Sequence, residues 1–172
     1  MGKVMVILGS ASDRGKMEPA IWELVGKVEV EVHVISAHRT PEKLRNIIMS
    51  SDADVCIAGA SMAAALPGAI ASLTSRPVIG VPLSGNVTNG IDALFTIAQM
   101  PKGVPVATVA IDGAENAAIL ALEILSLKNV NIGDEIYKMR EEMRVEAEVI
   151  DRDFIDHVNA RKRNFREKNR NR

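Results

Sequence analysis

The chain has 172 residues, of which 47% are hydrophobic and 25% charged, with a formal net charge of −1 and a single cysteine, Cys56. This profile is typical of one globular domain with a sizeable core, and it excludes a second full domain and a disulfide framework. The sequence has no run of about 18 apolar residues that could span a membrane and no signal peptide before the first strand, so we expect a cytoplasmic protein without a membrane partner.

Strand-like and helix-like segments alternate from the start of the chain. The nearly continuous apolar segment 3–8 is typical of a strand buried on both faces of a parallel sheet. A helix is predicted over 14–27, and a strand nearer the sheet edge over 28–35. The next helix should begin at Pro41, with Thr40 as its N-cap.

The same alternation continues through the middle of the chain. The remaining predicted strands are 55–59, 77–82 and 104–111, and the remaining predicted helices are 62–75, 91–99 and 114–127. Five such units imply right-handed crossovers and an α/β three-layer sandwich. The expected fold is flavodoxin-like, a five-stranded parallel sheet in the order 2-1-3-4-5, with the ligand at the switch point between strands one and three.

The C-terminal part differs in composition from the domain expected over 1–130. Residues 131–160 are predicted to form one or two amphipathic helices, whose apolar stripe a partner subunit would cover. The last segment, 161–172, holds seven Arg or Lys and one Glu, and we interpret it as a solvated, disordered basic tail. Nucleic acid is not an expected partner, because the chain has few aromatic residues and no stacking platform for bases.

Candidate site residues follow the first three strands, at the sheet edge where α/β proteins bind ligands. The turn 9–13 reads Gly-Ser-Ala-Ser-Asp, and Ser10 and Ser12 together with the free amides of a helix start form an anion cradle. Asp13 would accept hydrogen bonds from ribose hydroxyls. The structural alternative is a helix cap formed by Ser12 or Asp13.

The second turn brings Ser36, His38 and Arg39 to the same edge. An arginine at a helix start opposes the helix dipole unless a bound anion neutralises it, and an imidazole can exchange protons near neutral pH. A lone histidine at a strand end is commonly structural. Its pairing with the turn 9–13 is what favours a functional interpretation.

The third turn, 59–63, reads Gly-Ala-Ser-Met-Ala and falls close to the nucleophile elbow Gly-x-Ser-x-Gly, without the final glycine. A serine hydrolase would need a histidine after Ser61, and His157 in the charged C-terminal part is the one candidate. We therefore favour small residues that let the backbone approach a ligand. The sequence also lacks metal-ligand spacing and nucleotide-phosphate loops, so no metal or other cofactor is expected.

Taken together, these turns resemble the class I N(5)-carboxyaminoimidazole ribonucleotide mutase family. The resemblance extends over about residues 4–140, and the segments that carry it are 9–13, 36–41, 63–68 and 99–108. It implies a flavodoxin-like homo-octamer, with C-terminal helices that reach onto neighbouring subunits, acting on a small ribonucleotide. The family moves a carboxylate from the exocyclic nitrogen to ring carbon four of the aminoimidazole, through decarboxylation and recapture of carbon dioxide in a closed pocket.

The resemblance also assigns roles to individual residues. The substrate-binding set is Ser10, Ser12, Asp13, Ser36, Arg39, Ala60, Ser61 and Leu66. Within it the serines 10, 12 and 36 and Arg39 hold the 5′-phosphate, and Asp13 holds the ribose hydroxyls. His38 is the catalytic acid and base, and the loop 83–90 could close the pocket.

Three positions differ from the family pattern. Ser61 and Met62 stand where relatives carry Gly-Gly or Gly-Leu, and Ala65 stands where they carry a histidine near the imidazole ring. Two alternatives follow. One is a carboxylase that uses free carbon dioxide, although those enzymes usually have a lysine at the position of Arg39. The other is a nucleotide-binding paralogue of low activity.

Overall fold

The computed structural model describes the backbone of residues 2–170 and the side chains of residues 2–166. The chain divides into two compact units, Met1–Ile132 and Gly133–Arg172. The first unit is an α/β domain. The second belongs to a single long helix, α6, which runs from Val130 to Arg170.

Five parallel strands form the sheet of the first unit. They are β1 (Lys3–Leu8), β2 (Glu29–Val34), β3 (Val55–Ala60), β4 (Val78–Pro82) and β5 (Ala107–Thr108). Their order is β2-β1-β3-β4-β5. In the register, Val4 of β1 lies opposite Val30 on one side and Val55 on the other. The predicted flavodoxin-like strand order is confirmed.

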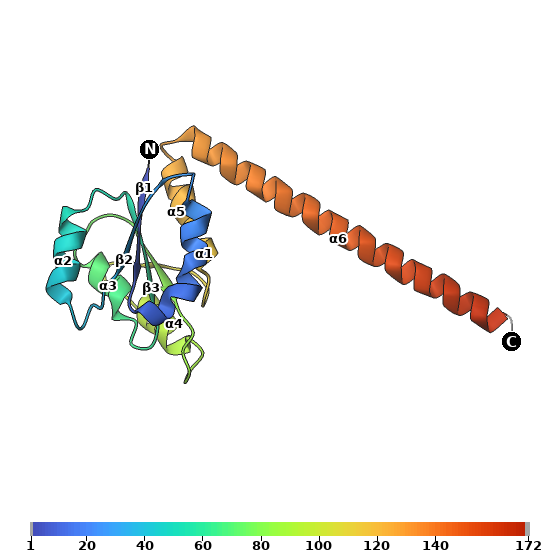
Figure 1. Cartoon of the computed structure of the whole chain (residues 1–172), viewed down its shortest axis with the longest axis horizontal. Helices are drawn as coiled ribbons and strands as arrows, with labels where there is room; N and C mark the ends of the chain where they lie inside the picture. The colour runs from blue at the N-terminus through green and yellow to red at the C-terminus, as the bar shows by residue number, and fades with distance from the viewer. Residues whose placement is uncertain (1, 171–172) are drawn as a thin grey trace. The chain divides into compact units, whose positions relative to one another are not determined.

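Helices cover both faces of this sheet, as Figure 1 shows. They are α1 (Arg14–Leu24), α2 (Pro41–Ser50), α3 (Ala65–Ala71), α4 (Ile91–Ala98) and α5 (Ala114–Ser126), and a short 3-10 helix, η1 (Ala11–Asp13), precedes α1. α1 and α5 lie together on one face, and α2 and α3 on the other. The result is the expected three-layer sandwich.

The core follows directly from the burial of the central strands. Every residue of β3 is buried, as are the last five of β1, whereas β2 at the edge has only exposed and half-buried residues. Met5 and Ile7 of β1 pack in one cluster with Leu44 of α2 and Ile70 of α3. Cys56 lies in the same cluster and is a buried residue of the core.

Three elements of the first unit are shorter than the sequence predicted by three residues or more. α1 ends at Leu24 instead of 27, because Gly26 adopts a left-handed φ of 86° in the turn before β2. β5 covers Ala107–Thr108 where a strand over 104–111 was expected, because Pro105 has no N–H to donate and the strand pairs with β4 alone. α3 begins at Ala65 rather than near 62, because Met62 and Ala64 adopt left-handed backbone angles that interrupt a helix.

The C-terminal part also differs from expectation. Instead of one or two helices ending near residue 160 and a disordered tail, α6 continues without a break through 161–170; residues 171 and 172 lie outside the described part. No glycine or proline occurs between 134 and 170 to interrupt the helix. Although α6 is long, none of the described helices is apolar enough over its length to cross a bilayer.

Candidate active site

The three turns that carry the candidate residues meet at one edge of the sheet, because β1, β2 and β3 are in register and end together. The Ile35 N–H donates to the Leu8 carbonyl at 2.9 Å, which ties the end of β2 to β1. The Gly9 N–H donates to the Gly59 carbonyl at 3.0 Å and ties β1 to β3. The side chains that follow these strands therefore face a common space.

That space is a cavity of about 220 Å³. Seven of the nine predicted site residues line it, namely Ser10, Asp13, Ser36, His38, Ala60, Ser61 and Leu66. They come from all three turns, and small side chains at 63–65 complete the wall. The cavity thus combines hydroxyls, one carboxylate and one imidazole with an apolar wall.

The other two predicted residues lie outside this cavity. Ser12 lines an adjoining hollow of about 750 Å³, which shares Asp13 and Ser61 with the cavity and is bounded on its far side by Ser84 and its neighbours. Arg39 is exposed and lines neither space. Within the described part of the chain its guanidinium makes no hydrogen bond or ion pair, so this cation is available to a ligand at the rim.

The first turn is organised by Ser10 rather than by Ser12 or Asp13. The Ser10 hydroxyl oxygen caps η1, accepting from the Ser12 N–H at 3.4 Å and from the Ser12 hydroxyl at 3.0 Å. Asp13 stands at the N-cap position of α1, but its side chain makes no capping hydrogen bond. The structural alternative is therefore wrong in its choice of residue, and the Asp13 carboxylate is left facing the cavity.

Asp13 is the one charged side chain that is buried among those the structure describes, with 5% of its surface exposed. Burial raises the pKa of this carboxyl group, and a hydrogen bond from the Ser61 hydroxyl at 3.4 Å offsets part of the effect. A buried carboxylate with a shifted pKa in a cleft is a common sign of a functional site. The Ser61 hydroxyl has a carboxylate as its partner, not an imidazole, which disfavours a serine hydrolase.

Replacing Asp13 with Asn should raise the melting temperature at pH 7. Because the native pKa of Asp13 is raised, the free energy of unfolding falls as the pH rises through that pKa, and a neutral amide removes this loss. The gain should disappear near pH 3, where the wild-type carboxyl is itself protonated. Thermal unfolding across this pH range measures the effect.

A matched control with the opposite sign is Asp92→Asn. The hydrogen bond from Thr88 lowers the pKa of Asp92, so this carboxylate stabilises the fold above its pKa and loses that contribution as the pH falls. Asp92→Asn should therefore lower the melting temperature at pH 7. If the two variants changed the melting temperature at pH 7 in the same direction and by the same amount, the Asp13 charge would not be destabilising.

The second turn is held by its own backbone and by Ser36. The Ser36 carbonyl accepts from the Thr40 N–H at 2.9 Å and from the Thr40 hydroxyl at 3.1 Å, and the Ser36 hydroxyl oxygen accepts from the Arg39 N–H at 3.3 Å. Thr40 precedes α2 as predicted, but without a side-chain cap. This closed turn presents His38 to the cavity while leaving its ring exposed.

The third turn contains two strained residues. Met62 has φ of 57° and Ala64 has φ of 42°, in the left-handed region that glycine adopts most readily. Glycine, one of the two residues that the resemblance implies at position 62, would adopt this backbone conformation without strain. The chain accommodates Met62 there with its side chain 70% exposed.

Replacing Met62 with Gly should stabilise the protein by about 1 kcal/mol, because glycine relieves the left-handed strain. Chemical denaturation measures the difference. Ala63→Gly is the control: Ala63 has no positive φ, so added freedom of the unfolded chain should make this variant less stable by about 0.5 kcal/mol. Destabilisation by both substitutions would show that position 62 carries no strain.

One group at the site was not anticipated from the sequence. The Lys16 ammonium group donates to both the carbonyl and the hydroxyl of Ser84, and the Ser84 N–H donates to Asp112 Oδ1 at 2.8 Å. These bonds anchor the start of the loop 83–90 beside the adjoining hollow. No local sequence pattern could have predicted this contact, because the three residues are far apart in the chain.

In the part of the chain that the structure covers, no group of three or more His, Cys, Asp or Glu side chains could hold a metal ion.

Comparison with known proteins places this geometry in context. The model of the family described as AIR carboxylase matches residues 3–146. The N5-carboxyaminoimidazole ribonucleotide mutase of Methanocaldococcus jannaschii is 53% identical over 142 residues, which cover 82% of this chain and 90% of that protein. The protein of the same name from Pyrococcus abyssi is 51% identical over 148 residues, covering 84% and 85%. The crystal structure of Treponema denticola PurE matches with a TM-score of 0.78 at 27% identity, covering 85% of this chain and 94% of that one.

Proposed function

Because the chain belongs to the AIR carboxylase family, we propose that it is an N5-carboxyaminoimidazole ribonucleotide mutase, an isomerase of purine biosynthesis. Two relatives at about half identity carry this name, and each matches more than four fifths of the chain. The observation that carries the proposal is the cavity at the ends of β1, β2 and β3. It joins anion-binding hydroxyls, a buried carboxylate and an imidazole in a single wall.

The proposed ligand occupies the cavity and extends into the adjoining hollow. A cavity of about 220 Å³ lies below the roughly 300–1,000 Å³ of typical ligand sites, so a ribonucleotide needs both spaces. Ser10, Ser12 and Ser36 donate hydroxyl hydrogen bonds to the 5′-phosphate, and Arg39 supplies the positive charge from the rim. Asp13, which borders both spaces, accepts from the ribose hydroxyls.

In the proposed mechanism His38 carries one proton between the two halves of the reaction. The bond between the exocyclic nitrogen and the carboxylate breaks, carbon dioxide leaves, and the nitrogen takes a proton from His38. Ring carbon four then attacks the trapped carbon dioxide, and its ring proton returns to His38. Ala60 and Leu66, both buried, contribute an apolar wall that limits water and keeps carbon dioxide beside the ring.

The loop 83–90 is the proposed closing element. Ser84 is fixed by Lys16 and Asp112, whereas residues 86–89 are exposed, and 86–88 line the hollow that the ribonucleotide would enter. An anchored base with an exposed tip suits a segment that moves over a bound ligand. Closure would exclude water at the stage when carbon dioxide is free.

A direct assay tests the proposal against its two alternatives. Purified protein is given N5-carboxyaminoimidazole ribonucleotide in one reaction and aminoimidazole ribonucleotide with bicarbonate in another. We expect the carboxylated product from the first substrate and little from the second. Efficient use of the second substrate would identify a carboxylase. Binding without product from either substrate would identify an inactive paralogue, and the first explanation to test would then be Ala65 in place of a histidine.

We further propose that the protein is a cytoplasmic homo-octamer. Several large apolar side chains of the first unit are exposed, which supports contacts between subunits. They include Trp22, Met49, Val87 and Phe95. Sedimentation analysis of the full chain should give the mass of eight chains, and the mass of a monomer would contradict the proposal.

A further inference from the structure

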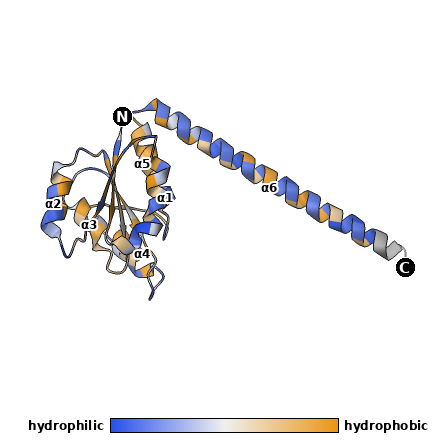
Figure 2. Ribbon diagram, viewed as in Figure 1, coloured by the Kyte–Doolittle hydropathy of each residue, from blue (hydrophilic) through white to orange (hydrophobic). Residues whose placement is uncertain are grey.

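Helix α6 extends well beyond the part of the chain that matches the AIR carboxylase model, which ends at residue 146. The extension is not uniformly polar: Figure 2 shows hydrophobic residues recurring along a largely hydrophilic helix. Ile150 is 62% exposed, Phe154 66% and Phe165 69%. Large apolar side chains that recur along one helix and remain exposed call for a partner surface.

These residues follow a regular spacing. The series Met143, Ala147, Ile150, Phe154, Val158, Arg161 and Phe165, which we call the seam, has successive intervals of four, three, four, four, three and four residues. Positions 143, 154 and 165 thus repeat every eleven residues. Because eleven residues make three turns of about 3.67 residues, the seam stays on one face of a nearly straight helix.

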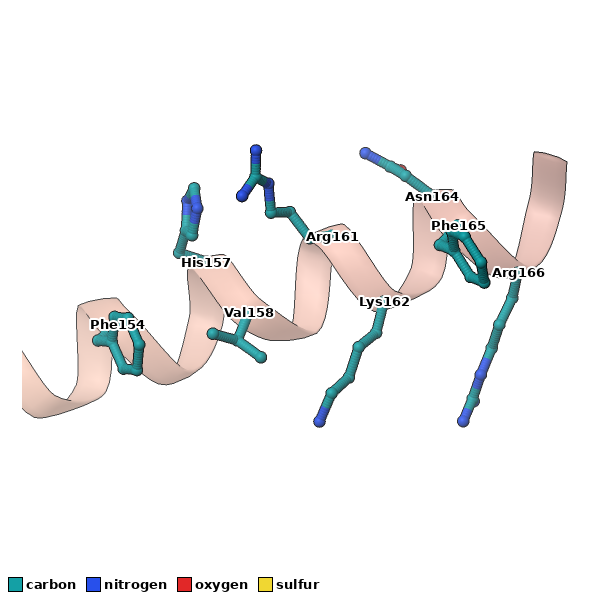
Figure 3. A pocket seen from close by; sticks show the side chains of 8 residues that line it. All are labelled: Phe154, His157, Val158, Arg161, Lys162, Asn164, Phe165 and Arg166. Atoms are coloured by element: carbon teal, nitrogen blue, oxygen red, sulfur yellow. The ribbon is translucent and has the colours of Figure 1, made fainter.

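The side chains along this stretch agree with that spacing, as Figure 3 shows. Phe154 and Phe165 lie between two rows of side chains. One row is His157, Arg161 and Asn164, and the other is Val158, Lys162 and Arg166. Of these flanking residues, Val158 and Arg161 belong to the seam, and the outer ones, His157, Lys162, Asn164 and Arg166, are polar or basic, the usual border of a helix face that packs on another helix.

The spacing of the seam residues is symmetrical about Phe154, with intervals of four, three and four residues on each side. If a second copy of α6 ran antiparallel with Phe154 opposite Phe154, Ile150 would lie level with Val158 and Met143 level with Phe165. Arg161 would lie level with Ala147, whose small side chain leaves room for a guanidinium group. An arginine in the seam is thus matched by the smallest seam residue.

Charge complementarity favours the same arrangement. Residues 142–153 hold five acidic and two basic residues, a net charge of −3, and residues 155–166 hold one acidic and four basic residues, a net charge of +3. An antiparallel pair centred on Phe154 places each −3 stretch beside a +3 stretch. A parallel pair would place like charges together.

We propose that α6 pairs antiparallel with α6 of a second copy of this chain, seam to seam, with the two-fold axis at Phe154. The pair spans residues 142–166, about 36 Å of helix. This contact joins two chains through a segment that lies mostly beyond residue 146, where the match to the family model ends. It does not depend on the proposed enzymatic function.

Single cysteines in the full chain test the geometry. Phe154→Cys, Met143→Cys and Phe165→Cys place thiols on the seam, and Val145→Cys is an off-seam control. The native Cys56 is 1% exposed, and burial raises the pKa of its thiol to about 11, so it should not react. A short bismaleimide joins neighbouring thiols, and the product is measured on a denaturing gel.

The expected pattern is specific to an antiparallel pair. Phe154→Cys should cross-link to itself, whereas Met143→Cys and Phe165→Cys should each do so about tenfold less, because their partners lie far apart. A co-refolded mixture of these last two variants should cross-link about as well as Phe154→Cys. Circular dichroism and thermal unfolding of each variant show whether the α/β domain is intact.

Other outcomes would overturn the proposal. Self-cross-linking of Met143→Cys and Phe165→Cys as strong as that of Phe154→Cys would mean a parallel pair. Absence of a Phe154→Cys product, or an equal product from Val145→Cys, would mean that the seam does not face itself. Raising the salt concentration should reduce the Phe154→Cys product, since the attraction between oppositely charged stretches is screened; an increase would also contradict antiparallel pairing.

Discussion

Replacing His38 with Asn should reduce mutase turnover by about 10²–10⁴-fold while leaving the affinity for the ribonucleotide nearly unchanged. His38 lines the cavity and is exposed to it, and in the proposed mechanism it does nothing but carry the proton. The Asn side chain retains polar contacts but cannot perform acid–base chemistry. Steady-state kinetics with the N-carboxylated substrate and calorimetry with the product separate the two effects.

His33→Asn is the matched control. His33 lies on β2, outside the cavity, with its Nε2 atom 2.7 Å from Glu31 Oε1. The same substitution there should leave turnover close to that of the wild type. Equal turnover in the wild type and His38→Asn would show that His38 does not transfer the proton. Equal losses of turnover in His38→Asn and His33→Asn would indicate a general effect on folding.

Arg39→Ala should weaken binding of the phosphorylated ligand by about 2 kcal/mol, which corresponds to about 30-fold in Kd. The guanidinium is exposed beside His38 just before α2, where the helix dipole disfavours a cation and a bound anion would offset this. Titration calorimetry measures the loss. With the nucleoside that lacks the 5′-phosphate, wild type and variant should bind equally.

Arg45→Ala separates this effect from a general loss of positive charge. Arg45 is an exposed arginine on α2, the helix that follows Arg39, and it lines neither the cavity nor the adjoining hollow. Its removal should change the affinity for the phosphorylated ligand little. Unchanged affinity in Arg39→Ala would contradict the phosphate-binding role.

Sequence pattern predicted the fold where burial decides the structure. The apolar segment 3–8 became β1 because a strand at the sheet centre needs hydrophobic residues on both faces, and the bounds agree. At the edge this logic fails: β5 retains two residues of the eight expected, since an edge strand is shaped by Pro105 and by its one neighbour. The end of α6 was misjudged because a run of basic residues indicates solvation as readily as a helix end.

The candidate site was predictable to the extent that topology determines it. Parallel strands end at one edge, so the turns after β1, β2 and β3 had to meet, and the cavity joins them. The left-handed angle of Met62 could not be foreseen, because nothing in a methionine signals it. Nor could the bonds from Lys16 to Ser84, which depend on how α1 packs beside a loop far along the chain.

The most direct test of the central claim is a crystal structure of the protein with the carboxylated aminoimidazole ribonucleotide product bound. We expect the 5′-phosphate beside Ser10, Ser36 and Arg39, the ribose hydroxyls on Asp13, and the His38 ring next to ring carbon four, within hydrogen-bonding reach of the carboxylate that this carbon carries. A nucleotide bound away from the ends of β1, β2 and β3, or a His38 ring turned away from it, would contradict the account.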